Sequence, residues 1–145
     1  MYRIVSKEML TPTICRMKVG ASRLASAALP GQFLIVRADE QGERIPLTIS
    51  DFDKDAGTVT IVTQKIGAST SEICSYEEGD SFSDVVGPLG IPSDFTEMSD
   101  EELAGKRYVF IAGGVGTAPV YPQVKWLHAH GVHVDVIIGA KTKAL

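Results

Sequence analysis

Residues 108–119 read YVFIAGGVGTAP, an apolar run followed by a glycine loop and a proline. The run over 108–112 carries no charged side chain, which is typical of a strand buried on both faces of a parallel sheet. Glycines let backbone N–H groups approach a phosphate closely, and the N-terminus of a following helix adds partial positive charge. The third glycine of the dinucleotide fingerprint is missing, so the local pattern leaves two interpretations open: a nucleotide-binding loop, or a tightened strand-to-helix turn.

A helix and a second strand are predicted downstream of this loop. Apolar residues recur at helical spacing between 120 and 127. Pro119 suits the first helical position, and Gly131 suits the residue just past the helix end. The apolar stretch over 132–139 predicts a second buried strand. Strand, loop, helix and strand together make a βαβ unit.

The chain before this unit has the pattern of an antiparallel barrel. Short stretches rich in Val, Ile, Thr or Phe are separated by turn residues such as Pro30-Gly31 and 53–57. A short helix is predicted from Ser69, because hydroxyl residues there offer N-caps. We therefore expect a six-stranded antiparallel β-barrel. Its predicted strands span 2–9, 13–18, 32–37, 45–51, 58–65 and 81–86.

A polar, acidic connector links the two patterns. Within it, Ser99 and Glu102 have capping-box spacing and predict a single helical turn. The expected organisation is a barrel over 1–91, a linker over 92–106 and an incomplete βαβ part of an α/β domain over 107–145. Two strands and one helix leave a sheet edge and an apolar face uncovered, so we expect a neighbouring chain to meet that face, self-association included, or poor order there.

Composition restricts the class of protein. The 145 residues include 14 basic and 18 acidic side chains, a net charge of −4, and 44% of the residues are hydrophobic. Such a chain can build a core, whereas its acidic balance argues against binding to duplex nucleic acid. No window approaches the roughly 20 apolar residues that span a bilayer, and the N-terminus carries charges where a signal peptide would be apolar. We expect a soluble, cytoplasmic protein that binds neither nucleic acid nor membrane.

The residues that most often bind metals or act as nucleophiles form no recognisable set. Cys15 and Cys74 are too few and too far apart in sequence for a disulfide scaffold or a zinc site, and we expect two small buried residues. His128, His130 and His133 have no cysteine or well-placed acid beside them, so no metal site is predicted. No catalytic acid, base or nucleophile is assigned.

Three further segments carry groups suited to a ligand. Arg44 opens an apolar strand, where its guanidinium is either solvated or in contact with a diphosphate. The Thr48 and Ser50 hydroxyls share one strand face, a spacing that could line the edge of a ring. At 67–71, hydroxyls and N–H groups cluster at the predicted helix start, as a second anion site or as an ordinary N-cap. The turn at 87–90 alone indicates only a turn.

In combination these segments resemble the ferredoxin–NADP reductase superfamily, in which a flavin-binding antiparallel barrel precedes a pyridine-nucleotide domain. The matching motifs are RIPLTIS (44–50), IGAST (66–70), VVGPLG (85–90) and AGGVGTAPVYP (112–122). The chain is most similar to one branch, the small subunits of NADH-dependent ferredoxin:NADP oxidoreductase, also known as sulfide dehydrogenase small subunits. The related electron-transfer subunits of dihydroorotate dehydrogenase more often read RRPISI and GxGT.

The resemblance implies residues for two cofactors. The residues that the resemblance assigns to the FAD diphosphate are Arg44, Gly67, Ser69 and Thr70. Those it assigns to the isoalloxazine ring are Pro46, Leu47 and Thr48. Those it assigns to the nicotinamide nucleotide, NAD(P)H, are Gly113, Gly114, Gly116 and Thr117.

The activity implied is that of an FAD-dependent NAD(P)H oxidoreductase subunit. Such an electron-transfer flavoprotein moves electrons between NAD(P)H and ferredoxin or iron–sulfur centres, beside a larger flavin and iron–sulfur subunit. Two alternatives stay open: the electron-transfer subunit of dihydroorotate dehydrogenase, and a non-enzymatic barrel module that only assembles with partners. The choice between NADH and NADPH stays open as well.

Members of this branch continue for about another domain after the second strand of the βαβ unit. That region normally supplies further parallel strands, the rest of the nicotinamide site and a cysteine cluster for a [2Fe-2S] centre. Such a cluster needs four thiolates and this chain has two cysteines, so no iron–sulfur centre is expected within it. We therefore expect a fragment or a truncated gene product that is incomplete for catalysis by itself.

Overall fold

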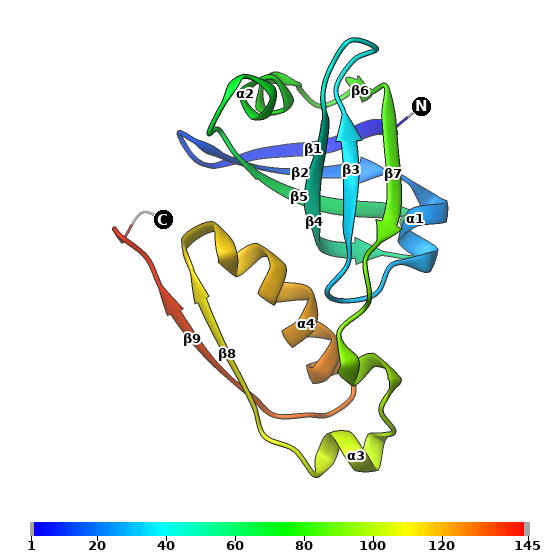
Figure 1. Ribbon diagram of the computed structural model, residues 1–145, viewed down its shortest axis with the longest axis vertical. Coiled ribbons are helices and arrows are strands. Elements are labelled where there is room, and N and C mark those ends of the chain that lie inside the picture. Colours follow the sequence, from blue (N-terminus) through cyan, green and yellow to red (C-terminus); the bar gives the residue numbers. More distant parts are fainter. Residues whose placement is uncertain (1, 144–145) are drawn as a thin grey trace.

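The computed structural model describes residues 2–143, and seven strands within this range form one antiparallel sheet that curves into a nearly closed barrel (Figure 1). The strand order is β6-β1-β2-β5-β4-β3-β7. The strands are β1 (Tyr2–Thr11), β2 (Ile14–Gly20), β3 (Phe33–Arg37), β4 (Arg44–Asp53), β5 (Thr58–Gln64), β6 (Ser81–Phe82) and β7 (Asp84–Leu89). The predicted antiparallel barrel is confirmed.

The predicted strand count of six is wrong, because the stretch 81–86 is divided at Ser83. Before this residue, β6 pairs with β1 at one edge of the sheet, and after it β7 pairs with β3 at the other edge. The Ser83 N–H donates to the carbonyls of Arg37 and Ala38, at 3.1 and 3.0 Å. One residue therefore carries the chain from one edge of the barrel to the other.

Two helices accompany the barrel strands. The predicted helix is α2 (Ala68–Ser75), which packs against β5. The helix α1 (Ser22–Ala27) was not predicted from the sequence. Its first turn holds no acidic residue, and among the described residues no side chain caps its start at Ala21. The usual start signals of a helix are missing there.

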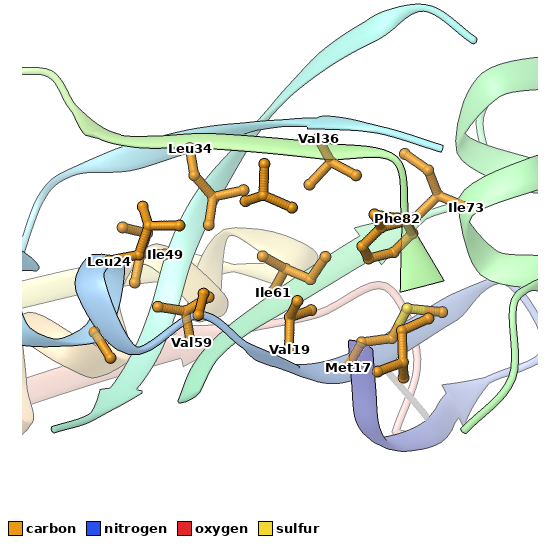
Figure 2. Close-up of a cluster of buried hydrophobic side chains, with 14 of the residues drawn as sticks. Met17, Val19, Leu24, Leu34, Val36, Ile49, Val59, Ile61, Ile73 and Phe82 are labelled. Carbon is orange, nitrogen blue, oxygen red and sulfur yellow. The ribbon is translucent and has the colours of Figure 1, made fainter. Parts of the chain in front are cut away.

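The barrel core is built from alternate positions of its strands, as expected for sheets with one buried face. Met17 and Val19 point inward from β2, and Val59 and Ile61 from β5 (Figure 2). Phe82 and the α2 residue Ile73 lie at one end of this cluster (Figure 2). Both cysteines belong to the cluster as well, which confirms that they are buried.

The last part of the described chain forms the predicted parallel βαβ unit. It consists of β8 (Tyr108–Gly113), the 3₁₀ turn η2 (Gly114–Gly116), α4 (Thr117–Ala129) and β9 (Val134–Gly139). Helix α4 begins two residues before Pro119, so this proline is its third residue rather than its first. Gly131 follows the helix end with a φ of +73°, as its predicted position requires.

The prediction that both parallel strands are buried on two faces is wrong within the described residues. Helix α4 covers one face of the β8–β9 sheet, while Val109, Ile111 and Ile137 on the other face are 50%, 76% and 57% exposed. These exposed residues form the uncovered apolar face expected for a sheet of two strands.

The connector between barrel and βαβ unit contains the 3₁₀ turn η1 (Asp94–Glu97) and the helix α3 (Asp100–Ala104). The predicted capping box is present: Glu102 N–H donates to the Ser99 hydroxyl, and Ser99 N–H donates to the Glu102 carboxylate. Phe95 and Leu103 from this connector are buried in a second core beneath α4.

The barrel core makes a direct prediction about stability. Ile61 is 1% exposed, so truncation to alanine is expected to lower the free energy of unfolding by about 2–5 kcal/mol through lost burial and an unfilled cavity. The matched control is Ile66→Ala, because Ile66 is 82% exposed and should change stability by less than about 0.5 kcal/mol. Urea unfolding of both variants measures the difference, and equal costs would contradict this placement of the core.

A second prediction concerns alkaline pH. Burial, and then the contact with Cys74, raise the pKa of the Cys15 thiol from 9.0 to about 12. The unfolded chain therefore ionises first, so this contribution to stability is complete below pH 9 and is lost as pH rises toward about 12. Urea unfolding with a reductant should show stability falling in that window, with a smaller fall in Cys15→Ala. An identical pH dependence in the variant would count against it.

Candidate functional site

The start of β4 lies against the N-terminus of α2, which brings two of the predicted motifs together. The Ser69 hydroxyl donates a hydrogen bond to the carboxylate of Glu43, the residue before β4. Arg44, the first residue of β4, is therefore close to the start of α2. This carboxylate at a helix start occupies a position where the partial positive charge of the helix favours an anion.

The N-terminus of α2 has the geometry of an open anion site. The Thr70 hydroxyl accepts hydrogen bonds from the N–H groups of Ile66 and Gly67, at 2.9 and 3.1 Å. The next N–H groups, those of residues 68–70, belong to the first helical turn, where no intrahelical acceptor is available, whereas the Ser71 N–H donates to the Gly67 carbonyl at 3.0 Å. At Gly67 a Cβ atom would meet no described atom within 4 Å, and its φ of −146° is open to any residue. Nothing in the described chain therefore requires a glycine at this position.

The other predicted residues of β4 differ in where they point. The Arg44 guanidinium donates to Asp84 of β7 at 3.0 Å, and both side chains remain partly accessible. Pro46 is exposed, and Thr48 is half-buried opposite Phe33 of β3. Leu47 packs against the barrel core, so its side chain is turned inward.

A cavity of about 500 Å³ lies between the outer face of the barrel and the βαβ unit. Strands β1, β2, β4 and β5 contribute to one wall, and the loop after β8, the start of α4 and the end of β9 form the other. Of the residues predicted to bind the nicotinamide nucleotide, Gly114 and Thr117 line this cavity. Gly113 and Gly116 lie in the same loop outside its lining.

Ser50 gives the cavity an unusual polar group. Its side chain is 5% exposed, and its hydroxyl has no hydrogen-bond partner among the described residues. A buried hydroxyl without a partner costs free energy, so such groups call for an explanation. Because Ser50 lines the cavity and lies two residues after Thr48, a polar ligand edge would satisfy it.

The charges around the cavity are largely paired. Lys125 of α4 donates to Asp51 of β4 at 2.6 Å, which joins the βαβ unit to the barrel. The hydrogen bond to Asp51 raises the pKa of Lys125, so this amine stays charged at neutral pH. Arg16 pairs with Glu8 on the neighbouring strand. A second contact between the units runs from the Ser93 hydroxyl to Gln123, at 2.9 Å.

Glycines also occupy open positions at the cavity rim. A Cβ atom on Gly116 or on Gly139 would meet no described atom within 4 Å, and neither has a positive φ. Gly114 differs, because its φ of +54° favours glycine for the backbone alone. Gly139 lines the cavity and therefore leaves space there for a ligand, whereas Gly116 is open but lies outside the cavity lining.

Several cavity residues were missed by sequence reasoning. Arg16 and Lys18 alternate with core residues on β2, a pattern that indicates an outward face but not what lies opposite. Tyr121 and Ile138 reach the cavity from α4 and β9. No local pattern predicts these positions, since they meet the barrel only through the packing of α4 against β4.

Neither a metal centre nor a membrane-spanning helix is found in the described part of the chain. Over residues 2–143 no group of three or more His, Cys, Asp and Glu side chains is placed to hold a metal ion. None of the helices in this same range is long and apolar enough to cross a membrane.

The comparisons with known proteins agree with this architecture, although no protein-family model matches the chain. It is 56% identical over 145 residues to the "Uncharacterized protein in adh 3'region" of Clostridium beijerinckii, covering 100% of this chain and 49% of that protein. It is 36% identical over 140 residues to the dihydroorotate dehydrogenase B (NAD(+)) electron transfer subunit homolog of Thermotoga maritima, covering 97% of this chain and 47% of that protein.

A solved structure gives the same picture. A chain from the structure of NADH-dependent reduced ferredoxin-NADP oxidoreductase superposes with a TM-score of 0.89 at 34% identity, over 99% of this chain and 50% of that one. The chain thus spans about half the length of the relatives it matches. Over this shared length the chain has a ferredoxin reductase-like fold and is homologous to oxidoreductase electron-transfer subunits.

Proposed function

We propose that the protein is an electron-transfer flavoprotein subunit that moves electrons between NAD(P)H and ferredoxin or iron–sulfur centres through FAD. The single observation that carries this proposal is the open glycine at Gly67, at the start of α2 beside Arg44. A diphosphate needs close approach to backbone N–H groups, and a side chain at this position would fill that space. The homology to electron-transfer subunits supports the same reading.

The residues present fit a flavin dinucleotide. The residues that would contact its diphosphate are Arg44, Gly67, Ser69 and Thr70. The residues that would lie against its ring are Pro46 and Thr48 on the outer face of β4, with Leu47 beneath them. The unpaired Ser50 hydroxyl continues this polar face into the cavity. When bound, a flavin supplies the hydride and single-electron chemistry, while the protein orients it.

The nicotinamide nucleotide is assigned to the loop of the βαβ unit. The residues that would contact it are Gly113, Gly114, Gly116 and Thr117, at the junction of a parallel strand and a helix. Such junctions at the carboxyl end of parallel strands are common nucleotide sites. The cavity between this loop and β4 would bring the two ligands to one place.

The partners proposed are a larger oxidoreductase subunit and ferredoxin. The Thermotoga maritima relative is described as an electron transfer subunit homolog, which supports a partner subunit. A [2Fe-2S] centre would have to be held by residues outside this chain, because two cysteines cannot supply four thiolates.

A second candidate is the electron-transfer subunit of dihydroorotate dehydrogenase, favoured by the similarity to relatives with that name. Both candidates use a flavin beside a nicotinamide nucleotide, so flavin binding alone does not separate them. Co-purification with a dihydroorotate-oxidising subunit would favour the second candidate. Reduction of ferredoxin in the assembled complex would favour the first.

Replacing the open glycine tests the diphosphate site. Gly67→Ala is expected to weaken FAD binding at least tenfold, because the new methyl group occupies the space of the diphosphate, while the free energy of unfolding changes by less than about 0.5 kcal/mol. Titration of the deflavinated protein, followed by flavin fluorescence, measures the affinity.

The control for this substitution is Gly131→Ala. Gly131 has a φ of +73° past the end of α4, so alanine there should cost about 1–2 kcal/mol of stability and leave FAD affinity unchanged. Unaltered FAD binding by Gly67→Ala would remove the main support for the proposal.

The carboxylate at the start of α2 provides a test in the opposite direction. Glu43 competes with any other anion for this position, so Glu43→Gln is expected to tighten FAD binding by several-fold. Glu40→Gln is the matched control, since Glu40 is an exposed acid in the same loop. Equal effects of the two substitutions would mean that only net charge matters and that Glu43 does not occupy the ligand site.

A further inference from the structure

The two cysteines of the chain meet inside the barrel. Cys15 on β2 and Cys74 on α2 are separated by 59 positions, yet their Sγ atoms are 2.7 Å apart. A disulfide bond has an S–S distance of about 2.05 Å, so bond formation requires less than 1 Å of further approach. The Cys74 thiol also lies 3.6 Å from the Thr63 carbonyl of β5.

This pair has no part in the flavin or nucleotide site. Cys15 is completely buried and Cys74 is 2% exposed. Free buried cysteines are usually isolated and inert, whereas two adjacent thiols from distant parts of the chain form an oxidisable pair. Their positions on different elements make the pair a potential covalent link between α2 and the sheet.

The two thiols differ in access. Cys74 lines a solvent-open hollow at the end of α2, and Cys15 does not line it. Lys7 and Lys65 also line this hollow, so it favours an anionic reagent over a cationic one. Glu77, which pairs with Lys7 at 2.5 Å, partly offsets that charge.

We propose that Cys15 and Cys74 form a reversible oxidation site that closes to a disulfide when an anionic low-molecular-weight disulfide, of the glutathione class, enters this hollow. Cys74 attacks the small disulfide first, forming a mixed disulfide and releasing one small thiol. Cys15 then attacks the Cys74 sulfur and releases the second small thiol. The two protein thiols lose two electrons and two protons in total, and the small disulfide is reduced to two thiols.

The electrostatics of Cys15 make its attack the pH-dependent step. Burial raises the pKa of this thiol, and its contact with the neighbouring Cys74 thiol raises it further. Once Cys74 is in a mixed disulfide, the contribution from its thiol is removed, and Cys15 becomes easier to ionise. Closure should therefore become faster as pH rises, because the attacking species is the thiolate.

Closure would tie α2 to β2. Cys74 is the seventh residue of the eight-residue helix, so the bond would hold the C-terminal turn of α2. A loop of nearly 60 residues would be cross-linked, which restricts the unfolded chain and raises the melting temperature. Reduction would return the helix to non-covalent packing against β5.

The experiment treats the reduced protein with oxidised glutathione and follows its intact mass. The expected product has lost two hydrogen atoms, runs as a monomer without reductant, yields a linked peptide containing Cys15 and Cys74, and has a higher melting temperature than the reduced form. Dithiothreitol should restore the original mass, remove the linked peptide and return the melting temperature to that of the reduced form. Retention of both free thiols, or disulfide-linked dimers instead, would overturn the proposal.

Single variants test the order of attack. Cys15→Ser should stop at a glutathione adduct on Cys74, whereas Cys74→Ser should remain unmodified because Cys15 is enclosed. An adduct on Cys15 in the second variant would overturn the assigned order. If a variant fails to fold, the linked peptide and the melting temperature of the native sequence still decide whether the disulfide forms.

Discussion

The closure of the barrel depends on one residue, Ser83, that belongs to neither of the strands it joins. Its N–H bonds to the end of β3, while the strands on its two sides pair with opposite edges of the sheet. An open seven-stranded sheet would leave two rows of unpaired backbone groups. Ser83 links the two edge strands along the chain, and β4, which lies between β5 and β3, contributes to both parts of the candidate site.

Strand β4 connects these two parts physically. Its first residues lie at the start of α2, and its last residues meet α4 and the cavity. The outward residues between them, Thr48 and Ser50, alternate with inward residues that fill the core. One strand thus supplies the core with its inner face and places the Thr48 and Ser50 hydroxyls on its outer face, as the two-residue repeat of a strand allows.

The sequence predicted the parts that local chemistry determines. The barrel strands followed from β-branched residues between turns, and the start of α3 followed from the spacing of Ser99 and Glu102. Features that depend on distant segments were not predictable. Ser83 divides a strand only because the residues on its two sides pair with different strands. Helix α1 lacks the capping and acidic side chains that indicate a helix start. The cavity and the contact of Cys15 with Cys74 arise when segments far apart in sequence pack together, and no local pattern records that.

The polar contacts between the βαβ unit and the barrel give the cavity a mechanical property. Partly exposed ion pairs such as Lys125–Asp51 are worth at most about 1 kcal/mol, little more than thermal energy. The two cores do not merge across the boundary, since Leu127 and its neighbours pack separately from the barrel cluster. The boundary can therefore open slightly without disturbing either hydrophobic core. In the proposed function, a ring ligand would enter this cavity and leave it while both parts stay folded, so ligand exchange would not require unfolding.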